Sequence, residues 1–312
     1  MKMLNNNKKE ILYSITLMVV PLAILFTTYI MSVEKKEEEV VKIQEETKLY
    51  IDSFSDLEIE AKSAIVKDLN TGEILFAKNA DLSLPLASIT KVLTVLTVDK
   101  LLKKDTIRIT NSDLMTEGDS NLLAGENFNT QDLIDLTLSI SSNDGATSLA
   151  SNAISSLQLG NRRIDFIDEM NKLAQEIGMY RSRFYNETGL DENEKRAGAY
   201  GSANDIATLF EYAITTNKGL FEGTAKSNLS VTSMEGYVHN ASNTNQIVDD
   251  LPNLIAGKTG FTDIAGGNLA VVIDPALNAP VAIVVLGSSI DGRFDDVEKL
   301  SEKTIEYFKN KK

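Results

Sequence analysis

Residues 85–94 read PLASITKVLT, and this stretch decides how the rest of the chain must fold around it. Apolar residues recur at helical spacing after Pro85, so we expect a helix that opens near Ser88. Residues three apart share a helix face, so the Lys91 amine can reach the Ser88 hydroxyl. A lysine buried near other cations loses its proton more easily and can act as a base. Taken alone, the pair also fits a capping serine beside a surface lysine.

Two further polar motifs lie downstream of this stretch. Ser141-Ser142-Asn143 places a hydroxyl and a carboxamide two residues apart, where the serine could relay a proton and the asparagine could bind a substrate amide. Alone, it reads as a polar turn, which the following Asp144-Gly145 favours. In Lys258-Thr259-Gly260, a lysine and a threonine hydroxyl on an edge strand suit an anionic substrate. The glycine lets that substrate approach the backbone closely.

The composition excludes several classes of site. The chain has no cysteine, so it has no disulfide, thiol nucleophile or thiolate metal site. It has one histidine, His239, which we expect to be structural because no partner for a catalytic triad lies near it in the sequence. The formal charge of −14 argues against nucleic acid as a partner, because binding phosphates needs a basic patch.

Strand and helix patterns alternate from about residue 57 and predict an α+β domain. We expect strands at 64–66, 74–77, 269–273 and 281–286, and helices at 92–102, 132–136, 166–177, 203–213 and 294–308. Strands therefore open and close the domain. The first hairpin must pair with the C-terminal strands to bury its face, which gives one sheet with helices packed on it and a helical subdomain beside it.

The first 56 residues have a different composition. Residues 11–31, ILYSITLMVVPLAILFTTYIM, carry no charge and are long enough to span a bilayer. We therefore expect a cytoplasmic tail at 1–10, a transmembrane anchor at 11–32 and a charged stalk at 33–56. A cleavable secretory signal and a disordered linker are the alternatives. Lysines flank the apolar run on both sides, so the charges leave its orientation open.

The order of the three motifs carries a resemblance to a known family. S-x-x-K followed by S-D-N and K-T-G is the signature of penicillin-binding proteins and class A β-lactamases. This chain has S-S-N in the middle, and the flanks extend the match: DLNTGEILFAKNAD, SISSNDGATSLA, FYNETGLD, GAYGSANDIATL and AGKTGFTDIAGGNLAVV. Over 57–312 the chain resembles the serine D-alanyl-D-alanine carboxypeptidases of peptidase family S11. The resemblance implies the β-lactamase and penicillin-binding-protein transpeptidase fold, an antiparallel sheet flanked by helices plus a helical subdomain.

The resemblance also implies a role for each motif residue. Ser88 is the expected nucleophile, Lys91 its base and Ser141 a proton relay. The expected substrate-binding residues are Asn143, Lys258, Thr259, Gly260, Phe261 and Arg293. Within this set, the backbone N–H groups of Ser88 and Phe261 are expected to form the oxyanion hole. Thr259 and Arg293 are expected to hold the terminal carboxylate of the substrate.

The implied activity is the removal of the terminal D-alanine from peptidoglycan stem peptides through a Ser88 acyl-enzyme. β-Lactam antibiotics would mimic the D-Ala-D-Ala end and inhibit the enzyme, and no metal or cofactor is expected. A single-pass protein of the cell membrane with its catalytic domain outside the cytoplasm fits this activity. Many relatives carry a second β-rich domain and a C-terminal anchor, whereas here the catalytic domain is expected to run to the chain's last residue, with the anchor at the N-terminus.

Three alternatives remain open from the sequence. The first is a DD-endopeptidase that cuts peptidoglycan crosslinks. The second is a β-lactamase, because residues 187–191 (ETGLD) resemble the E-x-x-L-N element that carries the deacylating glutamate in those enzymes. The S11 pattern N-x-x-G-L, which Asn186 to Leu190 fits, is the competing interpretation of the same residues. The third is a catalytically inactive protein that binds the cell wall.

Overall fold

The computed structural model of the chain describes residues 27–36, 38, 39, 42, 53–102, 105–118, 121–156 and 163–311. Residues 53–310 form one compact unit, and the residues before them form another. In that first unit, residues 27–36 are helical. Across the described part of the chain, no helix is long and apolar enough to cross a membrane. The expected tail, residues 11–26 of the expected anchor and most of the stalk lie outside the described residues, and all three segments stay predictions.

The sheet of the larger unit has five antiparallel strands in the order β10-β11-β12-β1-β2. Their bounds are Ser63–Asp68 for β1, Ile74–Lys78 for β2, Leu254–Thr262 for β10, Gly266–Ile273 for β11 and Val281–Ser288 for β12. β1 pairs along its whole length with β12, from Ser63 opposite Leu286 to Asp68 opposite Val281. The expected pairing of the first hairpin with the C-terminal strands is therefore confirmed.

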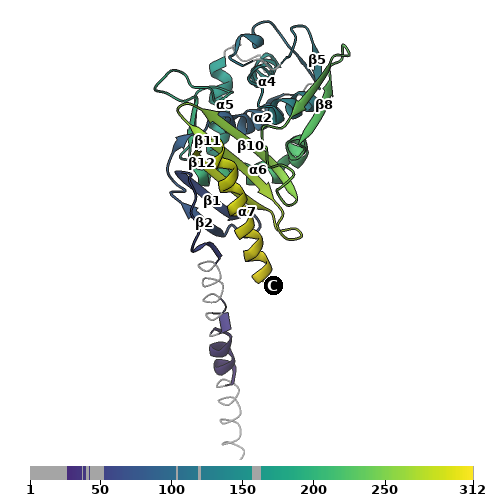
Figure 1. Ribbon diagram of the computed structural model, residues 1–312. Helices are drawn as coiled ribbons and strands as arrows, with labels where there is room; N and C mark the ends of the chain where they lie inside the picture. Colours follow the sequence, from purple (N-terminus) through teal and green to yellow (C-terminus); the bar gives the residue numbers. More distant parts are fainter. Residues whose placement is uncertain are drawn as a thin grey trace, which may run out of the picture. The chain divides into compact units, whose positions relative to one another are not determined.

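Helices α6 (Ala203–Asn217) and α7 (Gly292–Asn310) both pack against β12 (Figure 1). Ala282, Val284 and Leu286 of β12 belong to the main hydrophobic core together with residues of α6. The intervening residues of β12 are buried as well, and α7 buries Val297 and Leu300. Because successive strand residues point to opposite faces, the two helices cover the two sides of the sheet.

A helical subdomain continues the core beyond the sheet. Its helices are α2 (Thr90–Leu101), α3 (Thr130–Ser139), α4 (Asn143–Ser156) and α5 (Arg163–Glu176), with 3₁₀ turns η1 (Ala87–Ile89), η2 (Asp113–Met115) and η3 (Lys218–Ala225). One three-stranded sheet and two strand pairs complete it. The sheet has the order β3 (Leu84–Pro85), β7 (Ala199–Gly201), β6 (Arg183–Phe184), and the pairs are β4 (Thr106–Arg108) with β5 (Asn127–Asn129) and β8 (Asn228–Thr232) with β9 (Val238–Ser242).

Helix α2 is the central element of this subdomain. Every residue from Thr90 to Val98 is buried, polar residues included. A helix that is buried on all sides is typical of the middle of a domain. The functional motifs can therefore reach α2 from the sheet on one side and from α4 and the loops on the other.

Most expected helices and strands are confirmed, and two expectations need correction. Ser141 lies in a turn as expected, but Asp144 and Gly145 lie inside α4, so the turn does not continue over them. The helix escapes notice in the sequence because small polar residues dilute its apolar pattern. Ser88 lies in the 3₁₀ turn η1, before the α-helix begins at Thr90. The short strands β3 to β9 are not predicted, because two to five residues with few apolar side chains give no pattern.

Candidate active site

The expected nucleophile lies on a tight turn that leads into the central helix. Ser88 is the middle residue of η1 and is partly exposed. Ala87 before it has φ +49°, a left-handed conformation that is uncommon for residues other than glycine. Gly189, in the loop 185–198 between β6 and β7, packs so closely on this turn that a Cβ would overlap the Ala87 carbonyl oxygen. The turn and the loop therefore hold each other in place.

Lys91 is fully buried and is held by three acceptors from distant parts of the chain. Its Nζ donates to Ser88 Oγ at 2.8 Å, to Asn143 Oδ1 at 2.7 Å and to the Thr188 carbonyl at 2.8 Å. Burial lowers the pKa of Lys91 from 10.5 to about 7, and the negative charge of Glu187 opposes that shift. A substantial fraction of the amine is therefore neutral near pH 7 and able to accept the Ser88 proton.

The two functional residues of the second motif behave differently. Asn143 is the first residue of α4, and besides holding Lys91 it donates from Nδ2 to the Glu117 carbonyl at 2.7 Å. Ser141 lies in the turn before it with φ +63° and is partly exposed. Among the described residues, the Ser141 hydroxyl makes no hydrogen bond to Ser88 or Lys91. Its role as a proton relay remains a prediction, as does amide binding by Asn143.

The third motif lies on β10, the edge strand of the sheet, which packs against η1. Lys258 is buried, and its Nζ donates to the Thr259 carbonyl at 2.9 Å. Its pKa is well below the ordinary value because of burial, and then because of the charges of Lys91 and Arg293. Thr259 Oγ1 lies 2.6 Å from Thr244 Oγ1. Two hydroxyls and a cluster of cations therefore lie at the strand edge, where they suit an anionic group.

Arg293 reaches this strand from α7. Its guanidinium donates to the Gly260 carbonyl at 2.9 Å, while its Nε is buried without a partner. Burial also lowers the pKa of Arg293. A Cβ on Gly260 would lie 2.8 Å from the Leu86 carbonyl, so only glycine allows β10 to approach the nucleophile turn this closely. The side chain of Phe261 is 43% exposed, and the expected oxyanion role concerns its backbone N–H alone.

Several contributing residues are not predicted from the sequence. Thr188 acts through its backbone carbonyl, so its side chain carries no signal. Glu117 likewise holds Asn143 through a carbonyl. Thr244 gives no motif, although it lies 15 residues before Thr259 and contacts it. The sequence does single out Glu187 through its likeness to the E-x-x-L-N element. That likeness indicates a deacylating base, whereas both carboxylate oxygens of Glu187 are engaged by Thr147 and Arg163.

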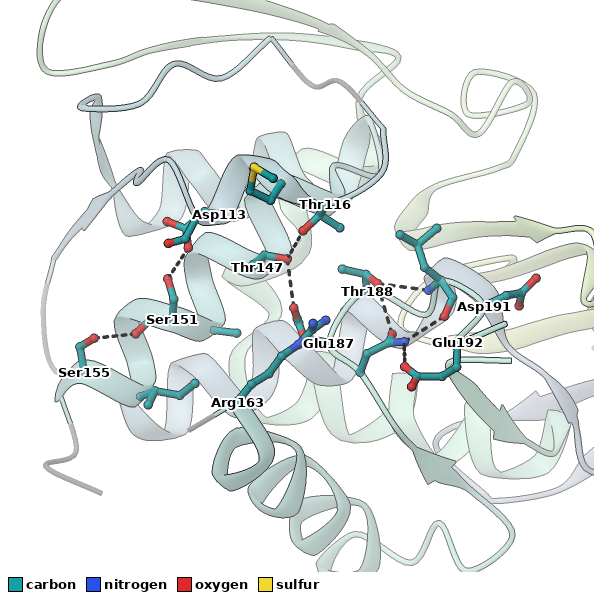
Figure 2. Close-up of a pocket in the computed structure, with 16 residues that line it drawn as sticks. Asp113, Thr116, Thr147, Ser151, Ser155, Arg163, Glu187, Thr188, Asp191 and Glu192 are labelled. Atoms are coloured by element: carbon teal, nitrogen blue, oxygen red, sulfur yellow. Dashed lines mark hydrogen bonds and ion pairs between the residues drawn. The ribbon is translucent and has the colours of Figure 1, made fainter. Parts of the chain in front are cut away.

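Thr188, whose carbonyl holds Lys91, also lines a cavity of about 690 Å³ (Figure 2). Its walls come from η2, α4, the first residue of α5 and the loop 185–198, and they carry Asp113, Thr147, Arg163, Glu187 and Glu192 among others. Across the described part of the chain, no three histidine, aspartate or glutamate side chains are grouped to hold a metal ion.

His239 lies away from this centre and has a structural partner. Its Nε2 is 2.8 Å from Glu126 Oε1, and both side chains are at most 9% exposed. Its ring also packs on Phe128, with centroids 5.4 Å apart. The contacts agree with the expected structural role.

Comparison with known proteins assigns the family. The family model for D-alanyl-D-alanine carboxypeptidases of peptidase family S11 matches residues 51–289. The chain belongs to peptidase family S11. It is 28% identical over 254 residues to the D-alanyl-D-alanine carboxypeptidase DacF of Bacillus subtilis, covering 79% of this chain and 62% of that protein. It is 31% identical over 239 residues to the D-alanyl-D-alanine endopeptidase of Pseudomonas aeruginosa, covering 73% of this chain and 72% of that one.

Solved structures share the fold. Penicillin-binding protein D2 of Listeria monocytogenes, solved with ampicillin bound, superposes with a TM-score of 0.64 at 28% identity, covering 80% of this chain and 98% of that one. A variant of the DD-transpeptidase of Streptomyces K15 gives a TM-score of 0.71 at 21% identity, with the same coverage. The expected penicillin-binding fold, with its antiparallel sheet and helices, is confirmed. An S11 serine peptidase is a hydrolase, and the choice between carboxypeptidase and endopeptidase remains open.

Proposed function

We propose that this protein is a serine DD-carboxypeptidase that removes the terminal D-alanine from peptidoglycan stem peptides. The observation that carries the proposal is the Lys91 amine, which is buried, has a pKa lowered to about 7 and lies 2.8 Å from Ser88 Oγ. A base with a pKa near the working pH is what proton transfer from a serine hydroxyl requires. The intact arrangement also argues against an inactive wall-binding protein.

The proposed reaction has two steps. Ser88 Oγ attacks the carbonyl carbon between the two D-alanines, and its proton passes to Lys91. The oxyanion accepts hydrogen bonds from the backbone N–H groups of Ser88 and Phe261. The bond to the terminal D-alanine breaks, the proton moves to its nitrogen, and an ester to Ser88 remains. Water then attacks the ester and gives up a proton, which returns to Ser88 as the shortened peptide leaves.

Recognition of the terminal carboxylate is assigned to the strand edge. Arg293 supplies positive charge, Lys258 supplies an amine donor, and Thr259 supplies a hydroxyl that contacts the hydroxyl of Thr244. The Arg293 guanidinium is anchored next to this edge by its hydrogen bond to the Gly260 carbonyl. An extended peptide can pair with the free side of β10, because an edge strand leaves backbone groups unpaired. β-Lactams would occupy the same place, which the ampicillin complex of the Listeria relative supports.

A DD-endopeptidase is the second candidate. Two curated endopeptidases, those of Pseudomonas aeruginosa and Escherichia coli, are 31% and 30% identical to this chain, and the chain spans 72% and 73% of their lengths. It spans only 62% of the carboxypeptidase DacF. A crosslinked dimer and an uncrosslinked pentapeptide are different substrates, so the endopeptidase and carboxypeptidase activities can be measured separately.

A β-lactamase is less consistent with the contacts of Glu187. Its carboxylate accepts from Thr147 Oγ1 at 3.0 Å and from Arg163 Nε at 2.7 Å, and it is 1% exposed. A deacylating base must reach a water molecule beside the ester, and this carboxylate is engaged on both oxygens.

The proposed location is the outer face of the cell membrane, with residues 11–32 as the anchor. The uncharged run in the sequence and the extracytoplasmic substrate support this location. No charge pattern fixes the orientation, so accessibility of residues 57–312 to an added protease in intact cells is the measurement that tests it.

The test of function uses the full chain solubilised in detergent. It is incubated with a pentapeptide ending in D-Ala-D-Ala and, separately, with a crosslinked dimer, and released D-alanine and monomer are measured. We expect D-alanine from the pentapeptide and none from the Ser88→Ala variant. Cleavage of the dimer alone would assign the endopeptidase, and rapid turnover of penicillin would assign the β-lactamase. Absence of all three activities would refute an active serine peptidase.

A further inference from the structure

Glu187 is a buried carboxylate that the proposed reaction does not use. It lies in the loop 185–198, directly before the residue whose carbonyl holds the Lys91 amine. Its side chain is 1% exposed, while that of its partner Arg163 is 58% exposed. Figure 2 shows both side chains on the wall of the cavity, with Thr147 approaching the carboxylate from α4. The guanidinium therefore faces solvent, and the carboxylate faces the protein interior.

The contacts of Glu187 join the loop to three helices. Its carboxylate binds Thr147 of α4 and Arg163 of α5. Its own carbonyl accepts from Thr94 Oγ1 of α2 at 2.7 Å. Thr94 lies three residues after Lys91 on the same helix, so two successive carbonyls of the loop, those of Glu187 and Thr188, are bound to α2. The carbonyl of Thr188 is thereby held in place as an acceptor for Lys91.

We propose that Glu187 is a positioning residue for acylation. It fixes the Thr188 carbonyl against Lys91, and its buried negative charge acts on the Lys91 amine. The inference rests on the proposed function, since it assigns Lys91 the part of the base. It differs from the role that the E-x-x-L-N likeness indicates, because Glu187 acts through Lys91 and not on a water molecule.

The charges around Glu187 and Lys91 determine whether removing the Glu187 charge raises or lowers the pKa of Lys91. Burial lowers the pKa of Lys91, and Glu187 is the nearby charge that raises it. Lys258 of β10 is the other cation that interacts with Lys91, and Arg163 compensates Glu187 from the solvent side. The elements packed around the pair carry further carboxylates. These are Asp113 of η2, Asp144 of α4, Asp99 of α2, Asp191, Glu192 and Glu194 of the loop, and Asp165, Asp168, Glu169 and Glu176 of α5. Removing the charge of Glu187 alone should therefore lower the pKa of Lys91 further.

A lower pKa of Lys91 in the absence of the Glu187 charge should shift the pH profile of acylation. The second-order rate of acylation by a fluorescent penicillin follows the neutral fraction of Lys91 in the free enzyme, so it falls on the acid side with a midpoint near pH 7. In Glu187→Gln the amide keeps the size of the side chain and can still bond to Thr147 and Arg163. We expect the acid midpoint of that variant to move to lower pH by roughly half to one unit. At pH 6 the rate, relative to its own plateau, should rise about three- to fivefold.

A matched control separates charge from structure. Thr147→Val removes one hydrogen bond to the carboxylate and keeps its charge. It should slow acylation at every pH and leave the midpoint where it is. If Glu187 were merely structural, both variants would lower the plateau equally and neither would move the midpoint, and that result would overturn the proposal.

A second charge variant covers the case in which Glu187→Gln fails to fold. Arg163 is more than half exposed, so Arg163→Met should fold, and it leaves the carboxylate uncompensated. Measured at low ionic strength, where an exposed charge is screened least, its acid midpoint should move to higher pH. A midpoint that is unchanged or lower would contradict the proposal.

The same measurements separate failure of this proposal from failure of the proposed function. Wild-type protein that penicillin does not acylate would refute the proposed function itself. Acylated wild type with no shift of the midpoint in the variants would refute only the role of Glu187.

Discussion

Replacing Lys91 by methionine should make the folded protein more stable at neutral and acid pH while abolishing acylation. The unfolded chain keeps the lysine proton up to the ordinary pKa of 10.5, and the folded protein releases it near 7. Below pH 7 both states carry the charge, and the folded state bears the full penalty of burying it. At about 1.4 kcal/mol per pH unit, that penalty is roughly 5 kcal/mol. Methionine fills a similar volume and carries no charge.

The loss of hydrogen bonds offsets part of this gain. Methionine leaves three acceptors without their donor: Ser88 Oγ, Asn143 Oδ1 and the Thr188 carbonyl. At about 1 kcal/mol each, they reduce the net stabilisation at pH 6 to about 2 kcal/mol, or a rise in Tm of about 4–8 °C. Above pH 7 the advantage should shrink by about 1.4 kcal/mol per pH unit, because the folded wild-type protein releases the lysine proton while the unfolded chain keeps it up to the ordinary pKa of 10.5. The variant should be the less stable protein above about pH 8.5.

The assay is chemical denaturation of both proteins between pH 6 and pH 9.5, with penicillin labelling to confirm that acylation is lost. Lys100→Met is the matched control, because Lys100 lies on the same helix, is 40% exposed and pairs with Glu176 at the surface. Its free energy of unfolding should stay within about 0.5 kcal/mol of wild type at every pH. A Lys91 variant less stable than wild type at pH 6, or a stability difference that does not change with pH, would refute the reasoning.

Two further predictions concern how the site is held. Gly189→Ala should reduce acylation by roughly tenfold or more and destabilise the domain by about 2 kcal/mol or more, because the φ of +81° is unfavourable for alanine and the added Cβ would overlap the Ala87 carbonyl; unchanged penicillin labelling would contradict this. Asp296→Asn should cost about 2–3 kcal/mol in denaturant unfolding, since the buried carboxylate accepts from the backbone N–H groups of Glu60 and Ala61; a loss under about 0.5 kcal/mol would contradict it.

The sequence predicts the chemistry of the site better than its geometry. The spacing of Ser88 and Lys91 places the two side chains within reach because both lie on one local element, a turn that continues into a helix. The hairpin at 63–78 has one apolar pattern that only the C-terminal strands can cover, so the sheet also follows from the sequence. Helix α4 does not, because its small polar residues give no clear periodicity.

The state of Lys91 was decided by the tertiary structure alone. Its acceptors on Asn143 and Thr188 lie 52 and 97 residues away in the chain, and no local pattern places them around the amine. Desolvation depends on everything that packs around a group, so the lowered pKa arises only when α2, α4 and the loop 185–198 come together. The sequence by itself therefore determined which residues could react, and the packing of distant segments determined that the lysine can be neutral when it is needed.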